Sequence, residues 1–369
     1  MNEPIFIARQ DTLEQEILPA HWLAQYKLFG EESYTFQDKG IWKKLCMSSA
    51  AANDRDIHAE ALEEMLTTFS AEHTGKWMLL VYGTNAAALE GLATMAAIAA
   101  NGTAMGAVVD NALLMHAIAN SETAMQRIAN SQTAMQRVAN NRGAMDAIGR
   151  SRIARDAVQA SPYYNSCIKE NDMAIAKLVV GFANLASANY SSMAGVVADA
   201  TAMTAVAASS TAMTAVAASS TAMTAVAASG VALKAIAQAY KNTANMLQFL
   251  KAVNASDTLI KRIYNTLTNA TALFGASQLG AQDGVADANS WATTSAAPNA
   301  FLACACGYYN SGGANVDVTY NGTAIAQNKT GTRQPGSVTS TNVNAITMAP
   351  STFTENGDGW LAVQKFTVK

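Results

Sequence analysis

The segment 201–230 constrains the fold of this chain more than any other, because one ten-residue word is written in it three times. It reads TAMTAVAASS, TAMTAVAASS and TAMTAVAASG. A repeat of fixed period is typical of quasi-one-dimensional arrays, in which each unit packs mainly on its neighbours. Such an array has the same side chains in every unit, whereas a catalytic pocket needs different residues at different places. The repeat therefore predicts an array without a catalytic pocket of its own.

Each word has the pattern of a short helix followed by a polar corner. Met203, Val206 and Ala207 are spaced i, i+3 and i+4, which places them on one helical face. The serines of the corner compete for backbone hydrogen bonds, and Ser210 is predicted to cap a helix that starts at Thr211. A helix of this size is roughly 11 Å long and is marginal in water by itself. The words must therefore be held by stacking.

The ten-residue period separates two architectures. Three turns in ten residues amount to about 3.3 residues per turn, against 3.6 in the α-helix, so a continuous coiled coil would be overwound at every repeat. We therefore expect a solenoid of short helices, with a trimeric coiled-coil shaft as the alternative. The predicted core of the repeats consists of Met105, Val108, Met125, Ile128, Met135, Val138, Met203, Val206, Met213, Val216, Met223 and Val226.

The repeat is present in degenerate form from about residue 84. Met recurs every ten residues from Met95 to Met145, with a β-branched residue three positions later, and Asn, Ser or Asp marks most corners. The register slips near 180–193, so an irregular joint is expected at about 161–192. In two of the early words, polar residues replace the Thr and Ala of the later words, which predicts a solvated face. These residues are Gln126, Arg127, Gln136 and Arg137.

Composition divides the chain into four predicted regions and makes the expected fold mainly α with a β tip. The regions are an α-rich N-terminal head (1–83), a degenerate repeat array (84–192), regular repeats with a cap of two longer helices (193–274) and a C-terminal antiparallel β domain (275–369). In the head, amphipathic patterns predict helices at 11–28 and 54–69, and a short strand is expected at Met78–Tyr82.

The C-terminal region is rich in Gly, Ser, Thr and Asn, and long helical patterns vanish from it. Asn321–Gly322 lies between two alternating runs and predicts a β-hairpin with a type I′ turn. Further strands are expected at Val338–Thr341, Ala345–Met348 and Trp360–Val368. Short strands of this kind indicate a small antiparallel sandwich.

Charge, cysteine content and hydropathy exclude several classes of protein. Charged residues make up 14% of the chain and the net charge is -3, which gives no reason to expect a nucleic-acid partner. Four cysteines in a chain of 369 residues do not make a disulfide framework or a zinc cluster. No segment offers about 20 strongly apolar residues, and the N-terminus lacks a signal-peptide pattern. We therefore expect synthesis in a cytoplasm without membrane insertion.

The sequence contains no recognisable catalytic, metal-binding or cofactor-binding pattern. Cys304 and Cys306 would lie on one face of a strand, which favours two small buried hydrophobes over a metal site. His116 replaces a small residue within a repeat and is expected at the surface. Glu63 and Glu64 are adjacent, and adjacent helix positions do not converge on one substrate. We therefore expect a protein that is not an enzyme and needs no cofactor.

Aromatic residues in the C-terminal domain are the candidate binding residues. Aromatic faces among Asn, Thr and Ser can stack on sugars, although each can equally form the core of a small domain. Tyr308 and Tyr309 are neighbours, so they should point in opposite directions. The receptor-contact candidates are Trp291, Tyr308, Tyr309 and Trp360, and Tyr320 belongs to the same aromatic set.

The repeats resemble those of a known protein family. Bacteriophage tail-fibre proteins carry runs of Ala-Met-x-x-Val-Ala-x-Ser words, and here the likeness covers roughly 92–240 and is best in TAMTAVAASSTAMTAVAASS. The order of head, repetitive shaft and β-rich tip also resembles theirs. The resemblance implies a virion structural protein. Its head would attach to other tail or baseplate proteins, and its tip would contact a glycan or protein on the host cell surface.

The resemblance also implies a homotrimer. Ala202, Ala205 and Ala208 would supply small flat surfaces where another chain can approach closely. Two other functions remain open. One is a collar, baseplate or capsid decoration protein, and the other is a tip that cleaves polysaccharide, which would need two carboxylates about 5–10 Å apart. The acidic residues of the tip are Asp283, Asp287, Asp317, Glu355 and Asp358.

Overall fold

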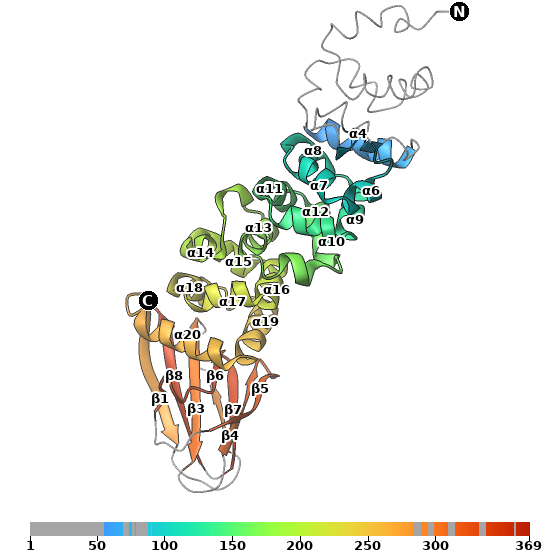
Figure 1. Cartoon of the computed structure of the whole chain (residues 1–369). Coiled ribbons are helices and arrows are strands. Elements are labelled where there is room, and N and C mark those ends of the chain that lie inside the picture. Colours follow the sequence, from blue (N-terminus) through green and yellow to red (C-terminus); the bar gives the residue numbers. More distant parts are fainter. Residues whose placement is uncertain are drawn as a thin grey trace, which may run out of the picture. The chain divides into compact units, whose positions relative to one another are not determined.

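The computed structural model describes most of the chain beyond residue 90 and short stretches before it (Figure 1). The described residues are 55–68, 74–75, 78, 88–89, 91–282, 289–293, 299–308, 314–331, 337–357 and 359–369. The chain divides into two compact units between Ala174 and Ile175. The division falls within the segment 161–192, where the sequence predicts an irregular joint.

The first unit consists of short helices. They are α4 (Arg55–Thr68), α6 (Met95–Ala100), α7 (Gly102–Val109), α8 (Ala112–Ala119), α9 (Glu122–Ala129), α10 (Gln132–Ala139), α11 (Arg142–Arg150), α12 (Arg152–Ala160) and the π-helical η6 (Tyr164–Ile168). Helix α4 confirms the helix predicted at 54–69. Met78 is helical, contrary to the strand predicted there, and the helix predicted at 11–28 lies outside the described residues.

Each word forms one helix that begins directly after a capping residue. In α9, Ser121 has an extended backbone, and its Oγ accepts a hydrogen bond from the N–H of Ala124 at 3.0 Å. Met125 and Ile128 are fully buried, as the periodicity predicts. The corner then turns the chain sharply, so that consecutive helices such as α7 and α8 are bent by 100°.

Repeat helices pack on the helix three words further along the chain. In the first unit α7 contacts α10, α8 contacts α11, and α9 contacts α12. The capping side chains add a bond to the helix four places earlier, as from Ser131 at the start of α10 to α6. Ser131 Oγ donates to Ala99 O at 2.6 Å and also accepts from the N–H of Ala134 at 3.3 Å. Ser151 and Ser161 make the same bond to carbonyls 32 residues earlier. The packing therefore has a period of three words.

The second unit repeats this arrangement with the regular words. Its helices are α13 (Asp172–Phe182, which begins before the division), η7 (Ser187–Asn189), α14 (Met193–Ala198), α15 (Ala200–Ala208), α16 (Ser210–Ala218), α17 (Ser220–Ala227), α18 (Gly230–Gln238), α19 (Thr243–Asn254) and α20 (Asp257–Asn269). Helix α14 contacts α17, α15 contacts α18, α16 contacts α19, and α17 contacts α20. The two longer helices predicted as a cap are thus present, and they continue the three-word period.

Two expectations about the regular words need correction. The N-cap of α16 is Ser209, whose Oγ accepts from the N–H of Ala212 at 3.2 Å, whereas Ser210 is already the first helical residue. Ala202 was expected at the surface but is fully buried, because it packs beside Met203 on the inner face. Consecutive helices here are bent by 101° and 95°. The regular words therefore do not form the continuous helix that the coiled-coil alternative requires.

The C-terminal part of the second unit contains two antiparallel four-stranded sheets. Their strands are β1 (Phe274–Gln282), β2 (Asn289–Thr293), β3 (Ala300–Tyr308), β4 (Ala314–Tyr320), β5 (Thr323–Thr330), β6 (Ala345–Met348), β7 (Ser351–Gly357) and β8 (Gly359–Val368). One sheet has the order β1-β8-β3-β6 and the other β2-β7-β4-β5, and β3 contacts β4 across them. The described residues thus confirm the predicted antiparallel β region.

The predicted strands have mixed outcomes. The hairpin is confirmed, since Asn321 and Gly322 both have positive φ, as a type I′ turn requires. Strands β6 and β8 confirm two further predictions. The strand predicted at Val338–Thr341 is wrong, because these residues form no strand and lead into a turn at 340–342. Asn342 Oδ1 accepts from the backbone N–H of Thr339 at 2.6 Å, and this side-chain bond displaces strand pairing.

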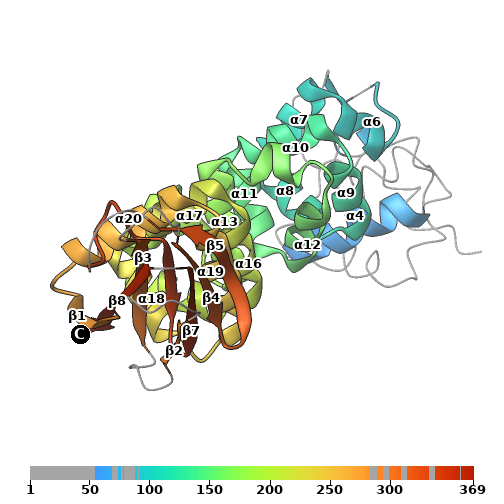
Figure 2. The same cartoon turned by 90° about the horizontal axis from the view of Figure 1, so that it is seen from below.

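Helices α19 and α20 join the repeat helices to the sheets. Helix α19 contacts β5 and β6, and α20 contacts β6 and β1 (Figures 1 and 2). The buried Asn254 of α19 fixes this junction. Its Nδ2 donates to Ile346 O at 2.7 Å, and its Oδ1 accepts from the N–H of Ile346 at 3.0 Å. On the array side, Thr266 Oγ1 of α20 donates to Ala227 O at 2.7 Å.

None of the described helices is individually long and apolar enough to cross a membrane. Three bent pairs of consecutive helices meet the length and composition criteria only when each pair is taken together.

Candidate functional site

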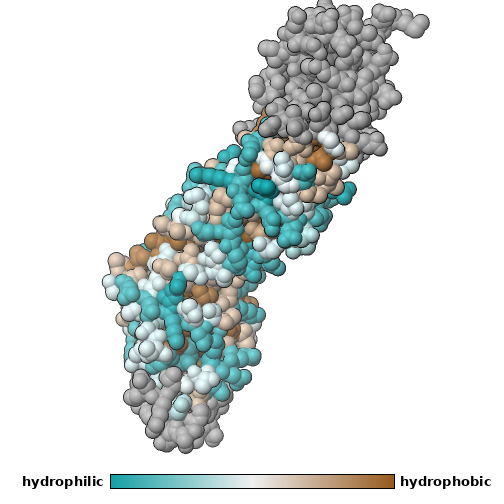
Figure 3. All heavy atoms as spheres, viewed as in Figure 1, coloured by the Kyte–Doolittle hydropathy of each residue, from teal (hydrophilic) through white to brown (hydrophobic). Residues whose placement is uncertain are grey.

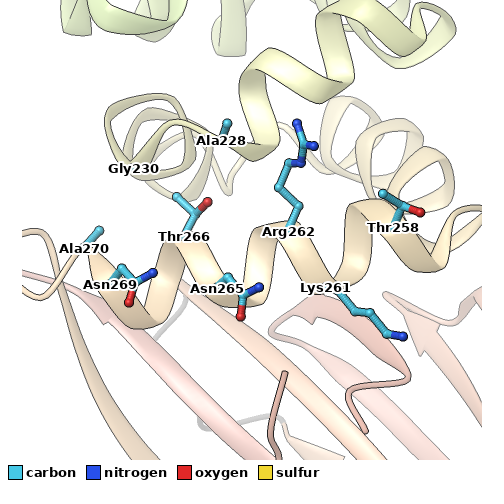
Figure 4. A pocket seen from close by; sticks show the side chains of 9 residues that line it. All are labelled: Ala228, Gly230, Thr258, Lys261, Arg262, Asn265, Thr266, Asn269 and Ala270. Carbon is cyan, nitrogen blue, oxygen red and sulfur yellow. The ribbon is translucent and has the colours of Figure 1, made fainter. Parts of the chain in front are cut away.

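An open groove of about 690 Å³, lined by polar and apolar groups, lies between α20 and the ends of α17 and α18 (Figure 4). Most of its wall is one side of α20. The lining residues are Ala228, Gly230, Thr258, Lys261, Arg262, Asn265, Thr266, Asn269 and Ala270.

The sequence of α20 creates this wall. In DTLIKRIYNTLTN the apolar side chains follow helical spacing, and Ile260, Ile263 and Leu267 are buried. Polar residues fill the remaining positions at intervals of three and four, which gathers their side chains along one stripe. Ser256 caps the helix, since its Oγ accepts from the N–H of Leu259 at 3.4 Å. An amphipathic helix thus turns a polar stripe toward the groove.

Gly230 shapes the opposite wall. The two preceding words have Ser210 and Ser220 at this position, at the first residue of the helix. A Cβ on Gly230 would lie 3.0 Å from Ala270 Cβ and 3.2 Å from Leu273 Cδ1. Glycine therefore lets the end of α20 approach α18, and the departure of the third word from the repeat has a packing reason.

Three anchors hold α20 in place. Thr266 is bonded to the array, as described above. Tyr264 Oη lies 2.8 Å from Val338 O and 2.9 Å from Gln364 Oε1, at the sheets, and burial raises the pKa of this phenol. Lys329 Nζ of β5 lies 3.0 Å from Asp257 Oδ1. The groove is therefore built on a helix fixed at both faces, which reduces the ordering cost of binding.

The groove offers hydrogen-bonding groups and positive charge. Its lining side chains include amides, hydroxyls and two cations, and none of the lining residues is a carboxylate, thiol or imidazole. Figure 4 shows Arg262 and Thr266 directed from α20 toward the repeat helices, while Lys261 extends along the other side of α20.

The aromatic receptor-contact candidates do not gather at this groove. Trp360 is fully buried in β8, so its prediction as a surface contact is wrong. Its register explains the burial, because it pairs with Gly307 of β3 inside the sheet. Tyr308 is half-buried at the end of β3. The backbone of Trp291 lies in β2, while its side chain and Tyr309 are outside the described residues. Tyr320 is also buried, at 2% exposure.

The cysteines and histidines give no site among the described residues. Cys304 and Cys306 are buried on the same strand, neither forms a disulfide with another described residue, and burial raises the pKa of the Cys304 thiol well above its usual value. No group of three or more His, Cys, Asp and Glu in the described part of the chain could hold a metal ion. His116, expected at the surface, is half-buried beside Asn120.

Glu63 has a structural role that the sequence did not reveal. Its carboxylate accepts hydrogen bonds from Ser121 Oγ, from the N–H of Thr123 at 3.1 Å and from Thr123 Oγ1 at 2.6 Å. These groups lie at the N-terminal end of α9, where an anion is stabilised by the helix dipole. Glu63 therefore fixes α4 against the array.

The groove residues were also missed by sequence reasoning. The available signals were the four-residue spacing of Lys261, Asn265 and Asn269 and the replacement of Ser by Gly230. In comparisons with known proteins, no family model matches the chain and no curated protein matches it. The function is therefore inferred from the repeat and from the groove.

Proposed function

We propose that this protein is a non-enzymatic structural component of a bacteriophage virion, a tail fibre or a similar tail appendage. The observation that carries the proposal is the array of short helices with similar cores, in which helices three words apart pack together and several capping side chains bond a carbonyl 32 residues earlier. An array of this kind serves length and stiffness. The resemblance of its words to tail-fibre repeats supplies the biological setting.

In this proposal the repeat helices form a solenoid shaft. Each word contributes Met and a β-branched residue to the interior and a capping side chain to the neighbouring turn. Met203, Val206 and Ala207 are all fully buried within one chain, which supports a shaft that is folded without a partner. The N-terminal region would attach to other tail or baseplate proteins, and the C-terminal β region would meet a glycan or protein of the host surface.

We further propose that the virion carries this protein as a homotrimer. The resemblance to tail-fibre repeats supports the trimer, whereas the structure weakens the argument from the small alanine surfaces. Ala202 is buried inside its own chain, and successive words are bent by about 100°, so the alanines of successive words do not form one continuous surface stripe.

The test is the location of the protein in particles of the phage that encodes it. Antibodies against residues 193–369, detected by gold labelling in electron microscopy, should mark tail appendages of purified particles. Labelling of the neck or capsid would instead favour a collar or decoration protein. Absence from purified particles, measured by mass spectrometry, would refute a virion role.

A further inference from the structure

The groove beside α20 has an unbalanced positive charge. Lys261 and Arg262 are exposed and line it, and neither makes an ion pair or hydrogen bond with another described residue. The nearest acidic residue of the same helix, Asp257, is already paired with Lys329. Two cations without carboxylate partners favour an anionic ligand, and the fork of Arg262 suits a carboxylate or phosphate.

The remaining lining groups favour a ligand that also carries hydroxyls. Asn265 and Asn269 each offer an amide donor and acceptor, and Thr258 offers a hydroxyl. These three lie along α20 together with the two cations. Asn265 and Asn269 are exposed, so a sugar with an acidic group could reach the cations and the amides together.

A second hollow extends the groove. It has a volume of about 310 Å³, it is lined by residues of β5 and of the turn before β6, and it shares Lys261 with the first. Its lining includes Asn328 and Thr341, together with the Asp257–Lys329 ion pair and Asn344, whose Nδ2 already donates to Thr330 O at 2.8 Å. Two polar hollows that meet at one lysine match a linear chain of sugars better than a single small ion.

We propose that these two hollows bind an acidic oligosaccharide, with its carboxylate or phosphate at Arg262 in the groove, Lys261 facing the second hollow, and its neutral hydroxyls at the asparagines. The inference rests on the proposed function for its biological setting, where it names the chemical class of the host receptor. The binding site would then be the junction of the repeat helices and the sheets, and not the aromatic residues of the strands.

The test is direct binding to the full-length protein by isothermal titration calorimetry. The acidic probes are an oligogalacturonate and a sialic-acid oligomer, and the neutral probe is a galactose oligomer of equal length. We expect one acidic probe to bind at least about ten-fold more tightly than the neutral probe. Affinity should also fall as salt is raised.

Variants localise the site. Arg262→Ala should weaken the acidic probe about ten-fold or more, the loss expected for a charge-assisted hydrogen bond. Lys251→Ala removes an exposed cation of α19 outside the groove and should leave affinity unchanged. Asn265→Ala should weaken the oligosaccharide but not inorganic phosphate. Circular dichroism checks that each variant is folded.

Three results would overturn the inference. They are no binding of either acidic probe at about 1 mM, equal losses in Arg262→Ala and Lys251→Ala, or phosphate that binds as tightly as the oligosaccharides. Incorporation of Arg262→Ala into particles separates this inference from the proposed function. A protein that is present in the virion but binds no acidic sugar would contradict the inference alone.

Discussion

The early words of the first unit and the regular words of the second differ in the two residues that follow the Met. They agree in the buried Ala-Met pair and in the buried β-branched residue. Helix α9 exposes Gln126 and Arg127, whereas α16 has Thr214 and Ala215 at the equivalent positions. Figure 3 shows hydrophilic residues gathered over helices of the first unit. Both helices nevertheless bury Ala-Met and, three positions after the Met, a β-branched residue, and both are capped by Ser. The fold of a word is therefore specified by its inner positions and its cap.

The largest effect is expected from breaking the ten-residue register. Deletion of 211–215 removes Met213 and misplaces the following apolar face, so the second unit should lose its cooperative thermal transition. Deletion of 211–220 removes one whole word and leaves α17, α18, α19 and α20 with equivalent neighbours, so melting should stay close to that of the parent. If both deletions melt alike by circular dichroism, the ten-residue structural unit is wrong.

Truncation of the shared core tests whether the two kinds of word are equally packed. Met125 and Met213 are both fully buried. Met125→Ala and Met213→Ala should each lower the free energy of unfolding by about 2–5 kcal/mol, as cavity-forming substitutions do. Urea titration of both variants measures this. A loss confined to one of the two units would show that the cores are not equivalent.

Removing a capping hydroxyl that makes two hydrogen bonds should have a moderate effect on stability. Ser209 Oγ accepts from the N–H of Ala212 and donates to Phe182 O at 3.0 Å. Ser209→Ala should cost about 1–2 kcal/mol in unfolding free energy. The matched control is the adjacent Ser210→Ala, at an exposed first helical position, with an expected change within about 0.5 kcal/mol. Equal losses at 209 and 210 would contradict the assignment of the cap.

Alkaline pH should distinguish the irregular word of the first unit from the regular words. Tyr164 is buried, and burial raises the pKa of its phenol to about 12, with Glu170 contributing. The folded state therefore holds this proton where the unfolded chain releases it, and stability falls as pH rises from about 10 to 12. Tyr164→Phe should reduce this fall when melting is followed against pH. An unchanged pH profile would exclude Tyr164 as its source.

The smallest effect is expected from exchanging the outer face. Replacement of Gln126 and Arg127 by Thr and Ala, as in the regular words, should change unfolding free energy by no more than about 0.5 kcal/mol. Chemical denaturation provides the measurement. A loss above about 2 kcal/mol would mean that the outer face, too, specifies the fold.

Sequence reasoning succeeded where neighbours in the chain decide the outcome. The burial of Met125 and Ile128, the corners and the Asn321–Gly322 turn all follow from local spacing. The capping serine was misplaced by one residue, because Ser209 and Ser210 are both good caps and only the corner angle selects between them. The three-word period was missed for the same reason, since the ten-residue repeat does not encode the angle between successive helices.

Prediction failed where contacts between residues far apart in the sequence determine the structure. The residues before Trp360 are polar, which suggests a surface aromatic. Its place in β8, however, depends on pairing with β3, which is far away in the sequence. The turn at Val338–Thr341 depends on the side chain of Asn342. The groove was not predictable because its walls, α20 and the Gly230 end of α18, meet only through packing of the array.

The cap that bonds a carbonyl 32 residues earlier also bears on how such a chain can change length during evolution. Each word carries its own donor and its own acceptor, so an in-frame duplication adds a complete unit and needs no compensating substitution. One added word, however, shifts everything after it by one third of the packing period, and three added words restore the original phase. Selection on the orientation of the C-terminal region would then favour gains and losses in threes, whereas selection on length alone would accept any number.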